Sequence, residues 1–468
     1  MITPKIAIVG AGPAGMAAAI EAARAGVTVH VYDENASPGG QIYRQPLPPM
    51  RSANGLATSR EAVRGERLRQ ELRAVGSRVV LHQGVLVWGA FGERTLVVWE
   101  NERSERVTPE VLVLATGAYD RPVPIPGWTL PGVYTAGATQ VLVKAQGVLP
   151  GQRVLIAGTG PLLPAVACQL ARAGARVVAV LEAASLRGAW RVLPRIWGQW
   201  ELVGDAWQYW RGMRTASIPY LRSRTVARIL GTETVQAVIT VALDDAWCPV
   251  PDTEKTVDVD AVCLGFGFVP STQLTQLCGC QHRYAPELGG WIPVLSSELE
   301  ATKPGVFAAG DATGIGGAMV AVREGRIAGI AAAARLGALT NAEAAARMRP
   351  HQRALARLRR LRVVMDNLTC VRDGLADLIT PETVICRCEE ITAAEIHAAL
   401  DEGTVDLAQL KRMTRAGMGY CQGRLCGPAL GALLARRLGV GMDAIPPLSI
   451  RPPVKPVPIE VMATLDEA

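Results

Sequence analysis

Four cysteines in the C-terminal part of the chain have a spacing that could hold an inorganic cofactor. Cys386 and Cys388 form a CxC pair, and Cys421 and Cys426 follow after 32 residues. Four thiolates match the ligand count of a [2Fe-2S] cluster. Structural zinc also takes four cysteines, but its ligands usually come in pairs two to four residues apart, so the CxC pair is atypical for zinc. The spacing therefore favours a [2Fe-2S] cluster over zinc or over four unliganded thiols.

Small and basic residues accompany these cysteines. Gly417, Gly419 and Gly423 would let backbone N–H groups approach the cluster sulfurs. Arg387 and Arg424 would help to stabilise the negative charge of the cluster. Such hydrogen bonds and charges are expected to raise the reduction potential of the cluster.

Short helices are predicted around the same cysteines. Thr392 and Glu395 form a capping box at the start of one helix, and Gly403 marks its end. Asp406 can cap a second helix that runs to about residue 415, and Pro428 suits the first turn of a third.

The other six cysteines show no strong motif, and no CxxC pair is available for a thiol–disulfide relay beside a flavin. They are Cys168, Cys248, Cys263, Cys278, Cys280 and Cys370. Electrons from a flavin would therefore leave by the cluster.

A second set of residues with chemical potential is a glycine loop between an apolar strand and an Ala-rich helix. The loop reads Gly10-Ala11-Gly12-Pro13-Ala14-Gly15. The first glycine allows a tight turn, the second lets the backbone approach a pyrophosphate, and the third lets helix and strand pack closely. The helix N-terminus then offers free N–H groups to the phosphates. Asp33 and Glu34 end the next strand, where a carboxylate can hydrogen-bond a ribose hydroxyl. The loop predicts a dinucleotide site.

Three later segments indicate FAD as the dinucleotide. One follows the acid and could lie against the pyrophosphate, one ends a strand that returns to the same crevice, and one places an acid after a late strand. Their candidate residues are Gly39, Gly40 and Gln41, then Ala115, Thr116 and Gly117, then Gly310 and Asp311. They resemble the fingerprints of flavoproteins of the glutathione-reductase class. In that class the late acid holds the ribityl chain of FAD, and Asp311 stands at the matching position.

A second glycine loop departs from the pattern. Gly158 and Gly160 keep the first two glycines, but Leu163 stands in place of the third. A bulky side chain there is expected to push the helix off the strand and to crowd a normal dinucleotide. Glu182 could still receive a ribose. Three interpretations stay open: an NAD(P) site, a site for another nucleotide or flavin such as FMN or ATP, or a scaffold that binds nothing.

Repeated strand–helix–strand units predict the elements that position these loops. We expect an α/β fold with two Rossmann-like, dinucleotide-binding domains of glutathione-reductase type and a small helical [2Fe-2S] domain. The expected boundaries are 1–145 and 255–345 for a discontinuous FAD-binding domain, 146–254 for an inserted second nucleotide-binding-like domain, 346–380 for an Arg-rich helical linker, 381–450 for the [2Fe-2S] domain and 451–468 for an extended tail.

The composition is that of a globular protein. The 468 residues are 49% hydrophobic and 19% charged, and the net charge is +7. Basic residues are spread along the chain, so no nucleic-acid partner is expected. Neither a signal-peptide pattern nor an 18-residue apolar run is present, which predicts a cytoplasmic protein without a membrane span.

Half of the ten tryptophans fall in one stretch, at intervals of 7, 3, 7 and 3 residues. They are Trp190, Trp197, Trp200, Trp207 and Trp210. This spacing indicates one face of a helix. Core packing, a subunit interface or a substrate pocket would each explain it.

Two further segments carry a family resemblance. Residues 115–122 read ATGAYDRP and residues 126–133 read PGWTLPGV. With them, nearly the whole chain resembles the A (alpha) subunits of heteromeric FAD-dependent amino-acid and opine dehydrogenases. That family includes octopine and nopaline oxidases, D-hydroxyproline dehydrogenase and the B subunit of hydrogen cyanide synthase. The closing module is similar to bacterioferritin-associated ferredoxin, although its second cysteine pair is wider than the usual CxxC and matches the CQGRxC form of this family.

The resemblance implies an electron-transfer subunit that carries FAD and a [2Fe-2S] cluster. It implies an FAD-containing, amine oxidase-like beta subunit that oxidises a C–N bond of an amino acid, imino acid or opine. It further implies a respiratory or other electron acceptor and a small [2Fe-2S] gamma subunit. No residue of this chain is assigned to catalysis. The alternatives are a self-contained NAD(P)H-dependent flavin/iron–sulfur reductase and a zinc-stabilised scaffold subunit that is not an enzyme.

Overall fold

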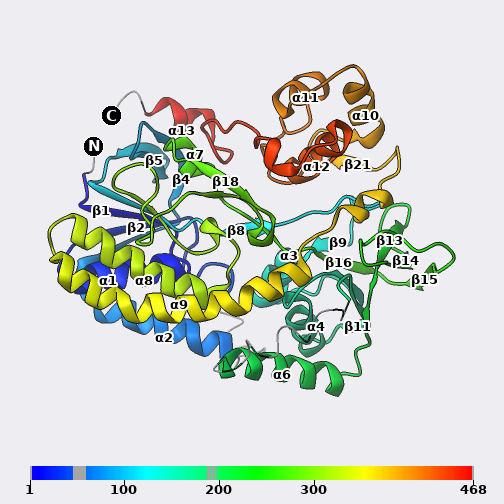
Figure 1. The fold of residues 1–468 in the computed structure, drawn as a ribbon, viewed down its shortest axis with the longest axis horizontal. Coiled ribbons are helices and arrows are strands. Elements are labelled where there is room, and N and C mark those ends of the chain that lie inside the picture. The colour runs from blue at the N-terminus through cyan, green and yellow to red at the C-terminus, as the bar shows by residue number, and fades with distance from the viewer. Residues whose placement is uncertain are drawn as a thin grey trace.

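A computed structural model describes residues 3–45, 60–185 and 199–465, together with Arg187, Trp190, Pro194 and Trp197 (Figure 1). Its first large sheet is parallel, with the strand order β20-β7-β1-β2-β3. The strands are β20 (Val306–Ala308), β7 (Val111–Leu114), β1 (Ile6–Val9), β2 (Val29–Asp33) and β3 (Val79–Gln83). All four residues of β1 are buried, because side chains on both faces of the sheet are covered.

Small residues allow two helices to pack closely on one face of this sheet. Helix α1 (Pro13–Arg24) lies against α8 (Ala318–Arg335). A Cβ added to Gly325 would lie 2.1 Å from the carbonyl oxygen of Ala14, and one added to Gly329 would lie 2.2 Å from that of Ala18. The Ala- and Gly-rich composition of both helices is therefore needed for the close contact that holds the first glycine loop in place.

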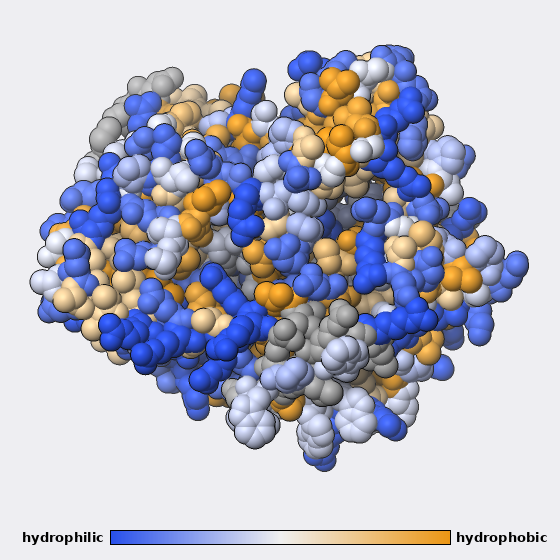
Figure 2. Space-filling model, in the orientation of Figure 1, coloured by the Kyte–Doolittle hydropathy of each residue, from blue (hydrophilic) through white to orange (hydrophobic). Residues whose placement is uncertain are grey.

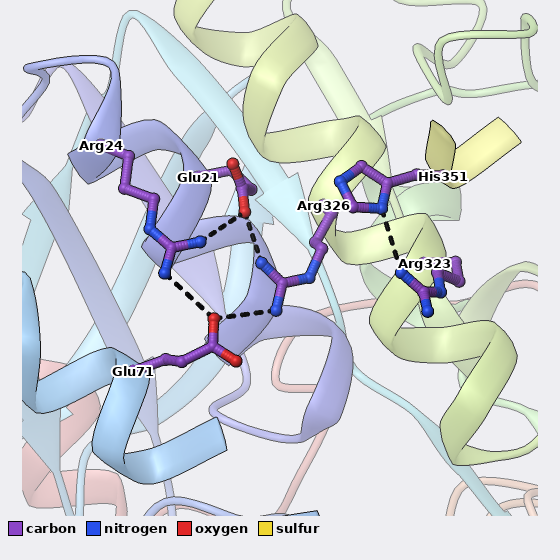
Figure 3. Close-up of polar contacts among 6 residues, drawn as sticks. All are labelled: Glu21, Arg24, Glu71, Arg323, Arg326 and His351. Carbon is purple, nitrogen blue, oxygen red and sulfur yellow. Dashed lines mark hydrogen bonds and ion pairs between the residues drawn. The ribbon is translucent and has the colours of Figure 1, made fainter. Parts of the chain in front are cut away.

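An ion-pair cluster joins the same helices to α2 (Arg60–Ala74), as Figure 3 shows. Arg326 of α8 reaches Glu21 of α1 at 2.5 Å and Glu71 of α2 at 2.9 Å. Arg24 contacts the same two carboxylates at 3.0 and 3.1 Å. Arg326 and Glu21 are both largely buried, and each keeps a second partner, Glu71 and Arg24 respectively, so the four charges form one network that joins the three helices.

Helix α9 (Asn341–Thr369) crosses from the first sheet to the second (Figure 1). It begins at a capping box formed by Thr340 and Glu343. Arg323 of α8 contacts His351 of α9 at 3.3 Å (Figure 3). The far end of α9, at Thr369, lies beside the second glycine loop.

The second large sheet is also parallel, with the order β12-β11-β10-β16-β9. Its strands are β12 (Tyr220–Arg222), β11 (Arg176–Glu182), β10 (Arg153–Gly158), β16 (Ala261–Gly265) and β9 (Val133–Thr135). Helices α3 (Ala136–Val141) and α4 (Leu162–Arg172) pack beside it. Strands β9 and β16 belong to this sheet although they lie outside residues 146–254, because β16 pairs with β10 and β9 pairs with β16.

Smaller antiparallel sheets complete the body of the molecule. They are β4 (Leu86–Phe91), β5 (Thr95–Glu100) and β6 (Arg103–Val107); β13 (Arg224–Leu230), β14 (Ala237–Ala242) and β15 (Lys255–Asp258); β8 (Ala118–Asp120) with β17 (Phe268–Pro270); and β18 (His282–Ala285) with β19 (Gly290–Pro293). The β4–β6 sheet shares a core with the face of the first sheet that α1 and α8 leave free.

The C-terminal module has the helices and caps that the sequence predicts. It contains β21 (Val384–Cys386), β22 (Ile391–Thr392), α10 (Ala393–Asp401), α11 (Leu407–Thr414) and α12 (Gly427–Leu438). Thr392 and Glu395 form the capping box, the Asp406 side chain accepts a hydrogen bond from the Gln409 N–H at 2.7 Å, and Pro428 lies in the first turn of α12.

The chain after this module returns to the first half of the protein. The Val454 N–H donates to the Trp88 carbonyl at 2.6 Å, and Lys455 forms an ion pair with Glu34. The expected extended tail also contains a short helix, α13 (Ile459–Ala463), which packs on β6. The Ser104 hydroxyl donates to the Val461 carbonyl at 2.7 Å. The tail thereby ties the C-terminal module to the β4–β6 sheet and to the end of β2.

The tryptophan-rich stretch is exposed, and the expectation of core packing is wrong for it. Helix α6 (Trp200–Thr215) carries Trp200, Trp207 and Trp210, with 63%, 56% and 51% of their surface exposed, and Trp197 just before it is 81% exposed. Figure 2 shows pale aromatic side chains projecting along the edge where α6 lies in Figure 1. The spacing indicated the shared face correctly, but periodicity does not reveal whether another element covers that face.

Candidate functional site

The first glycine loop has the geometry of a close backbone approach. Gly10 has φ +99°, and a Cβ there would lie 2.4 Å from the Ala115 carbonyl oxygen. A Cβ on Gly15 would lie 1.8 Å from the Gly10 carbonyl oxygen, so only glycine lets α1 pack on β1. At Gly12 the nearest atom to an added Cβ is the Gly40 Cα, 3.9 Å away. The first and third glycines therefore serve the fold, and the second leaves space in front of the helix N-terminus.

The acid at the end of β2 is held against this loop. Asp33 accepts hydrogen bonds from the Ala11 N–H at 2.5 Å and from the backbone and side-chain nitrogens of Asn35 at 2.7 and 2.8 Å. Glu34, its neighbour, forms the ion pair with Lys455 and is more exposed. Lys455 was not predicted from the sequence, because nothing in the tail itself indicates where it docks.

The three later segments converge on the loop as predicted. The Gly39 N–H donates to the Ala11 carbonyl at 2.8 Å, and a Cβ on Gly40 would lie 2.9 Å from the Gly12 Cα. Gly310 packs so closely on Ala14 that a Cβ there would lie 2.8 Å from the Ala14 Cβ.

Two polar side chains of these segments are fixed by neighbouring loops. Asp311 accepts hydrogen bonds through one carboxylate oxygen from the N–H groups of Gly316 and Gly317, both at 3.0 Å. The Thr116 hydroxyl donates to the Ser271 carbonyl at 2.7 Å. The second Asp311 oxygen is thus left for another donor.

A single large cavity brings most of the predicted residues together. Its volume is about 1350 Å³. Small-molecule sites are usually about 300–1,000 Å³, so this cavity has room for an extended dinucleotide and more. The predicted residues that line it are Gly10, Gly12, Pro13, Ala14, Asp33, Glu34, Gly40, Gln41, Ala115, Thr116, Gly117, Gly160, Gly310 and Asp311. Gly15, Gly39 and Gly158 do not line it, and their role is in packing and turns.

The second glycine loop opens into the same cavity. A Cβ on Gly158 would lie 2.0 Å from the Gly265 carbonyl oxygen, so the first turn is as tight as in the first loop. Leu163 is fully buried and does not line the cavity. A Cβ on Gly265 of β16 would lie 2.7 Å from the Leu163 side chain. The expected crowding by Leu163 does not occur, because a glycine on the neighbouring strand makes room for it.

Glu182 is satisfied by the protein itself. One carboxylate oxygen accepts hydrogen bonds from the Gly160 N–H at 3.0 Å and the Tyr220 hydroxyl at 2.9 Å, and the other from the Ala184 N–H at 3.1 Å. Burial raises the pKa of Glu182 above its ordinary value, and these donors oppose that shift.

The four C-terminal cysteines stand in two pairs. The Cys426 thiol is the largest influence on the pKa of Cys386, and Cys421 is the thiol neighbour that acts most on the pKa of Cys388. In the described part of the chain, no three His, Cys, Asp or Glu side chains gather around a single ion. Tetrahedral zinc needs all four ligands on one ion, whereas a [2Fe-2S] cluster divides its four cysteines between two irons. The pairs therefore fit the binuclear cluster better.

Backbone groups support a thiolate at Cys386. The Gly417 N–H donates to its sulfur at 3.5 Å. The pKa of Cys386 is lowered to about 6, mainly by the Cys426 thiol and to a smaller extent by backbone N–H groups such as that of Gly417. A Cβ on Gly419 would lie 2.2 Å from the Cys388 Cβ, so this loop can pass the cysteines only as glycine. Gly417 has the expected N–H contact with a cysteine sulfur, whereas Gly419 is needed for the close approach of the loop to Cys388.

The module is anchored beside the cavity. The Trp128 indole donates to the Val384 carbonyl at 2.6 Å, two residues before the first cysteine of the site. Arg424, between Cys421 and Cys426, lines the large cavity together with Tyr119 and Arg121. Burial raises the pKa of Tyr119 to about 12, which keeps this phenol neutral near pH 7. Tyr119 and Arg121 stand in the ATGAYDRP segment, but no role was predicted for them, because the motif does not reveal which of its side chains face a cavity.

All ten cysteines are free thiols, and Cys370 is the one cysteine among the described residues that line the cavity. A redox-active cysteine pair is thus absent from the described lining. Among the helices that the structure describes, none combines the length and apolar character needed to cross a bilayer.

The chain is similar to known proteins over nearly its whole length. Residues 4–325 match a family described as pyridine nucleotide-disulphide oxidoreductase, and residues 384–436 match the BFD-like [2Fe-2S] binding domain. Hydrogen cyanide synthase subunit HcnB of Pseudomonas aeruginosa is 36% identical over 460 residues, which covers 98% of both chains. The A subunit of opine oxidase from Rhizobium meliloti is 35% identical over 473 residues, which covers 98% of this chain and 87% of that one. The crystal structure of L-proline dehydrogenase from P. horikoshii aligns with a TM-score of 0.72 at 21% identity, over 98% of this chain and 79% of that one, and shares the fold.

Proposed function

We propose, because the chain belongs to the pyridine nucleotide-disulphide oxidoreductase family, that it is the FAD- and [2Fe-2S]-containing electron-transfer subunit of a heteromeric oxidoreductase. The two family matches imply these cofactors. The relatives are named as subunits of hydrogen cyanide synthase and of opine oxidase. The reaction of the complex would be oxidation of a C–N bond in an amino acid, imino acid or opine.

One observation carries this proposal. The cavity lined by the first glycine loop is also lined by Arg424, which lies between two of the four cysteines in the sequence. A flavin in this cavity and a cluster on the cysteines would therefore be neighbours, as a relay of electrons requires.

The residues of the first loop would hold FAD. The N-terminus of α1 at Gly12 and Pro13 would face the pyrophosphate, Asp33 the ribose and Asp311 the ribityl chain. FAD, when bound, supplies a group that takes up an electron pair and can release the electrons singly. The chain itself positions the cofactor and, through the packing of Gly10 and Gly15, fixes the loop before any ligand arrives.

Substrate oxidation would take place on a partner. We propose a cytoplasmic complex with a respiratory or other acceptor, an FAD-containing, amine oxidase-like beta subunit, and a small [2Fe-2S] gamma subunit. The support is that relatives of the whole chain are named as subunits rather than as complete enzymes.

An anaerobic absorption spectrum of the purified full-length protein, with flavin, iron, zinc and acid-labile sulfide assays, tests the proposal. The expected result is one FAD and about two irons and two sulfides per chain. Zinc without iron would contradict the relay and favour the scaffold alternative.

The second candidate is a self-contained NAD(P)H-dependent reductase. The observation in its favour is that Gly160 and the second loop line the same cavity as the first loop. Anaerobic mixing with NADH and NADPH separates the two. We expect no bleaching of the flavin, and rapid bleaching by either cofactor would support the reductase.

A further inference from the structure

A thin wall of side chains separates the large cavity from a smaller one beside the cysteine module. The smaller cavity has a volume of about 110 Å³. Residues that line both cavities are Tyr119, Arg121, Gln273, Tyr284, Gly289 and Arg424. This wall is therefore the part of the protein through which the two sites are in contact.

Arg424 brings an unpaired charge to the wall. Its guanidinium is half-buried, and within the described ranges it has neither an ion pair nor a side-chain hydrogen bond. Tyr119 lines both cavities together with Arg424, and Cys421 lies three residues before Arg424 in the chain. Arg387, the other arginine among the four cysteines, is exposed.

The two cysteine pairs differ in their position relative to this wall. Cys386 and Cys426 are each 1% exposed and belong to the hydrophobic core of the module. Cys388 and Cys421 are only half-buried. Cys421 is followed directly by Gln422, Gly423 and Arg424, which line the smaller cavity. The Cys388–Cys421 pair is thus the outer pair, and Cys421 adjoins the wall.

We infer that Tyr119 and Arg424 form the junction through which electrons pass between the flavin cavity and the iron held by Cys388 and Cys421, and that Arg424 raises the reduction potential of the cluster. This inference rests on the proposed function. For each electron that crosses, the flavin loses one electron and one ferric ion becomes ferrous. Two crossings, with the cluster reoxidised by the proposed electron acceptor between them, oxidise a fully reduced flavin, whose two protons pass to solvent. An unpaired cation beside the sulfurs stabilises the added negative charge, and the neutral Tyr119 bridges the gap without a charge of its own.

The test is a redox titration of the full-length protein, followed by the electron paramagnetic resonance of the reduced cluster. At the potential where the wild-type cluster is half reduced, Arg424→Gln should lower the ratio of reduced to oxidised cluster about tenfold, equal to about 59 mV for a one-electron couple. The matched control Arg387→Gln removes an exposed arginine from the first cysteine pair and should shift the ratio less than about twofold, because solvent screens its charge. Arg424→Lys keeps the charge and should restore most of the wild-type ratio, and Arg424→Met replaces Arg424→Gln if that variant loses iron.

Tyr119→Leu tests the junction separately from the potential. It should leave the cluster potential unchanged and slow the transfer of electrons to the cluster after flash reduction of the flavin. Equal shifts for Arg424→Gln and Arg387→Gln, or an unchanged transfer rate in Tyr119→Leu, would overturn the inference. A protein that contains zinc and no iron would instead overturn the proposed function itself.

Discussion

The two glycine loops follow the same path from strand through turn to helix, but they solve the packing at the third position differently. In the first loop the helix carries the glycine: a Cβ at Gly15 would lie 1.8 Å from the Gly10 carbonyl oxygen. In the second the helix carries Leu163, and the missing side chain is on the neighbouring strand, at Gly265. The requirement is for space between helix and sheet, and the glycine can come from either side.

The acids at the ends of the following strands differ as well. Asp33 is held by the Ala11 N–H and by Asn35, both within the first nucleotide unit. Glu182 receives an additional hydroxyl from Tyr220, on the edge strand of the second sheet, and is only 3% exposed. Both oxygens of each acid already have donors in the protein, so Glu182 differs from Asp33 in the additional bond from the Tyr220 hydroxyl. The glycine spacing alone would not distinguish these two situations.

The largest expected effect on flavin content comes from placing a charge in the space in front of the first helix. Gly12 has φ −71°, and an added Cβ finds its nearest atom at 3.9 Å, so Gly12→Glu should fold. Its carboxylate would repel a pyrophosphate, and flavin per purified chain should fall at least about tenfold, equal to about 1.4 kcal/mol of binding.

The matched variant is Gly160→Glu in the second loop. The φ of +96° there costs a non-glycine residue roughly 1–2 kcal/mol, but flavin and iron should stay at wild-type levels. If both variants lose flavin while circular dichroism shows that they are folded, the two loops do not act as separate ends of the cavity.

The sequence predicted what depends on local spacing. The Thr392–Glu395 box and the cap at Asp406 are found as expected, because a cap needs only residues three or four positions apart. The first glycine loop and its acid were predicted for the same reason. The space for Leu163 was not, because Gly265 belongs to a strand that is distant in the sequence.

The features that the sequence did not predict depend on contacts between distant parts of the chain. Lys455 reaches Glu34 because the tail folds back over the first sheet, and Arg424 reaches the cavity because the indole of Trp128 anchors the module there. No periodicity or motif encodes such docking. The exposure of Trp207 could not be predicted either, because its helical spacing is equally consistent with a face that another element covers.

On folding stability rather than flavin content, the larger effect is expected from the packing at the third position of the second loop. Leu163→Ala should cost about 2–5 kcal/mol of unfolding free energy, and Gly265→Ala about 1–3 kcal/mol, because its Cβ would lie 2.7 Å from the leucine side chain. The double variant should cost less than the sum by about 0.5–3 kcal/mol, since the alanine at 265 then fills part of the space. Urea denaturation of the four proteins measures this coupling. Strict additivity would show that Gly265 does not compensate for Leu163.

The smaller effect on the free energy of unfolding concerns Glu182, the acid of the second loop. Tyr220→Phe removes one donor from Glu182 and should lower the unfolding free energy by about 1.5–3 kcal/mol near neutral pH. Burial already raises the pKa of Glu182, and loss of the hydroxyl should raise it further. A folded-state pKa above the unfolded value means that the folded protein binds more protons, so stability falls as pH rises through this window. The difference between variant and wild type should therefore shrink as the pH is lowered and Glu182 becomes protonated. Denaturation at two pH values measures it, with Tyr420→Phe, at an exposed tyrosine, as the control. A pH-independent difference would show that the lost contact is packing rather than a hydrogen bond to a carboxylate.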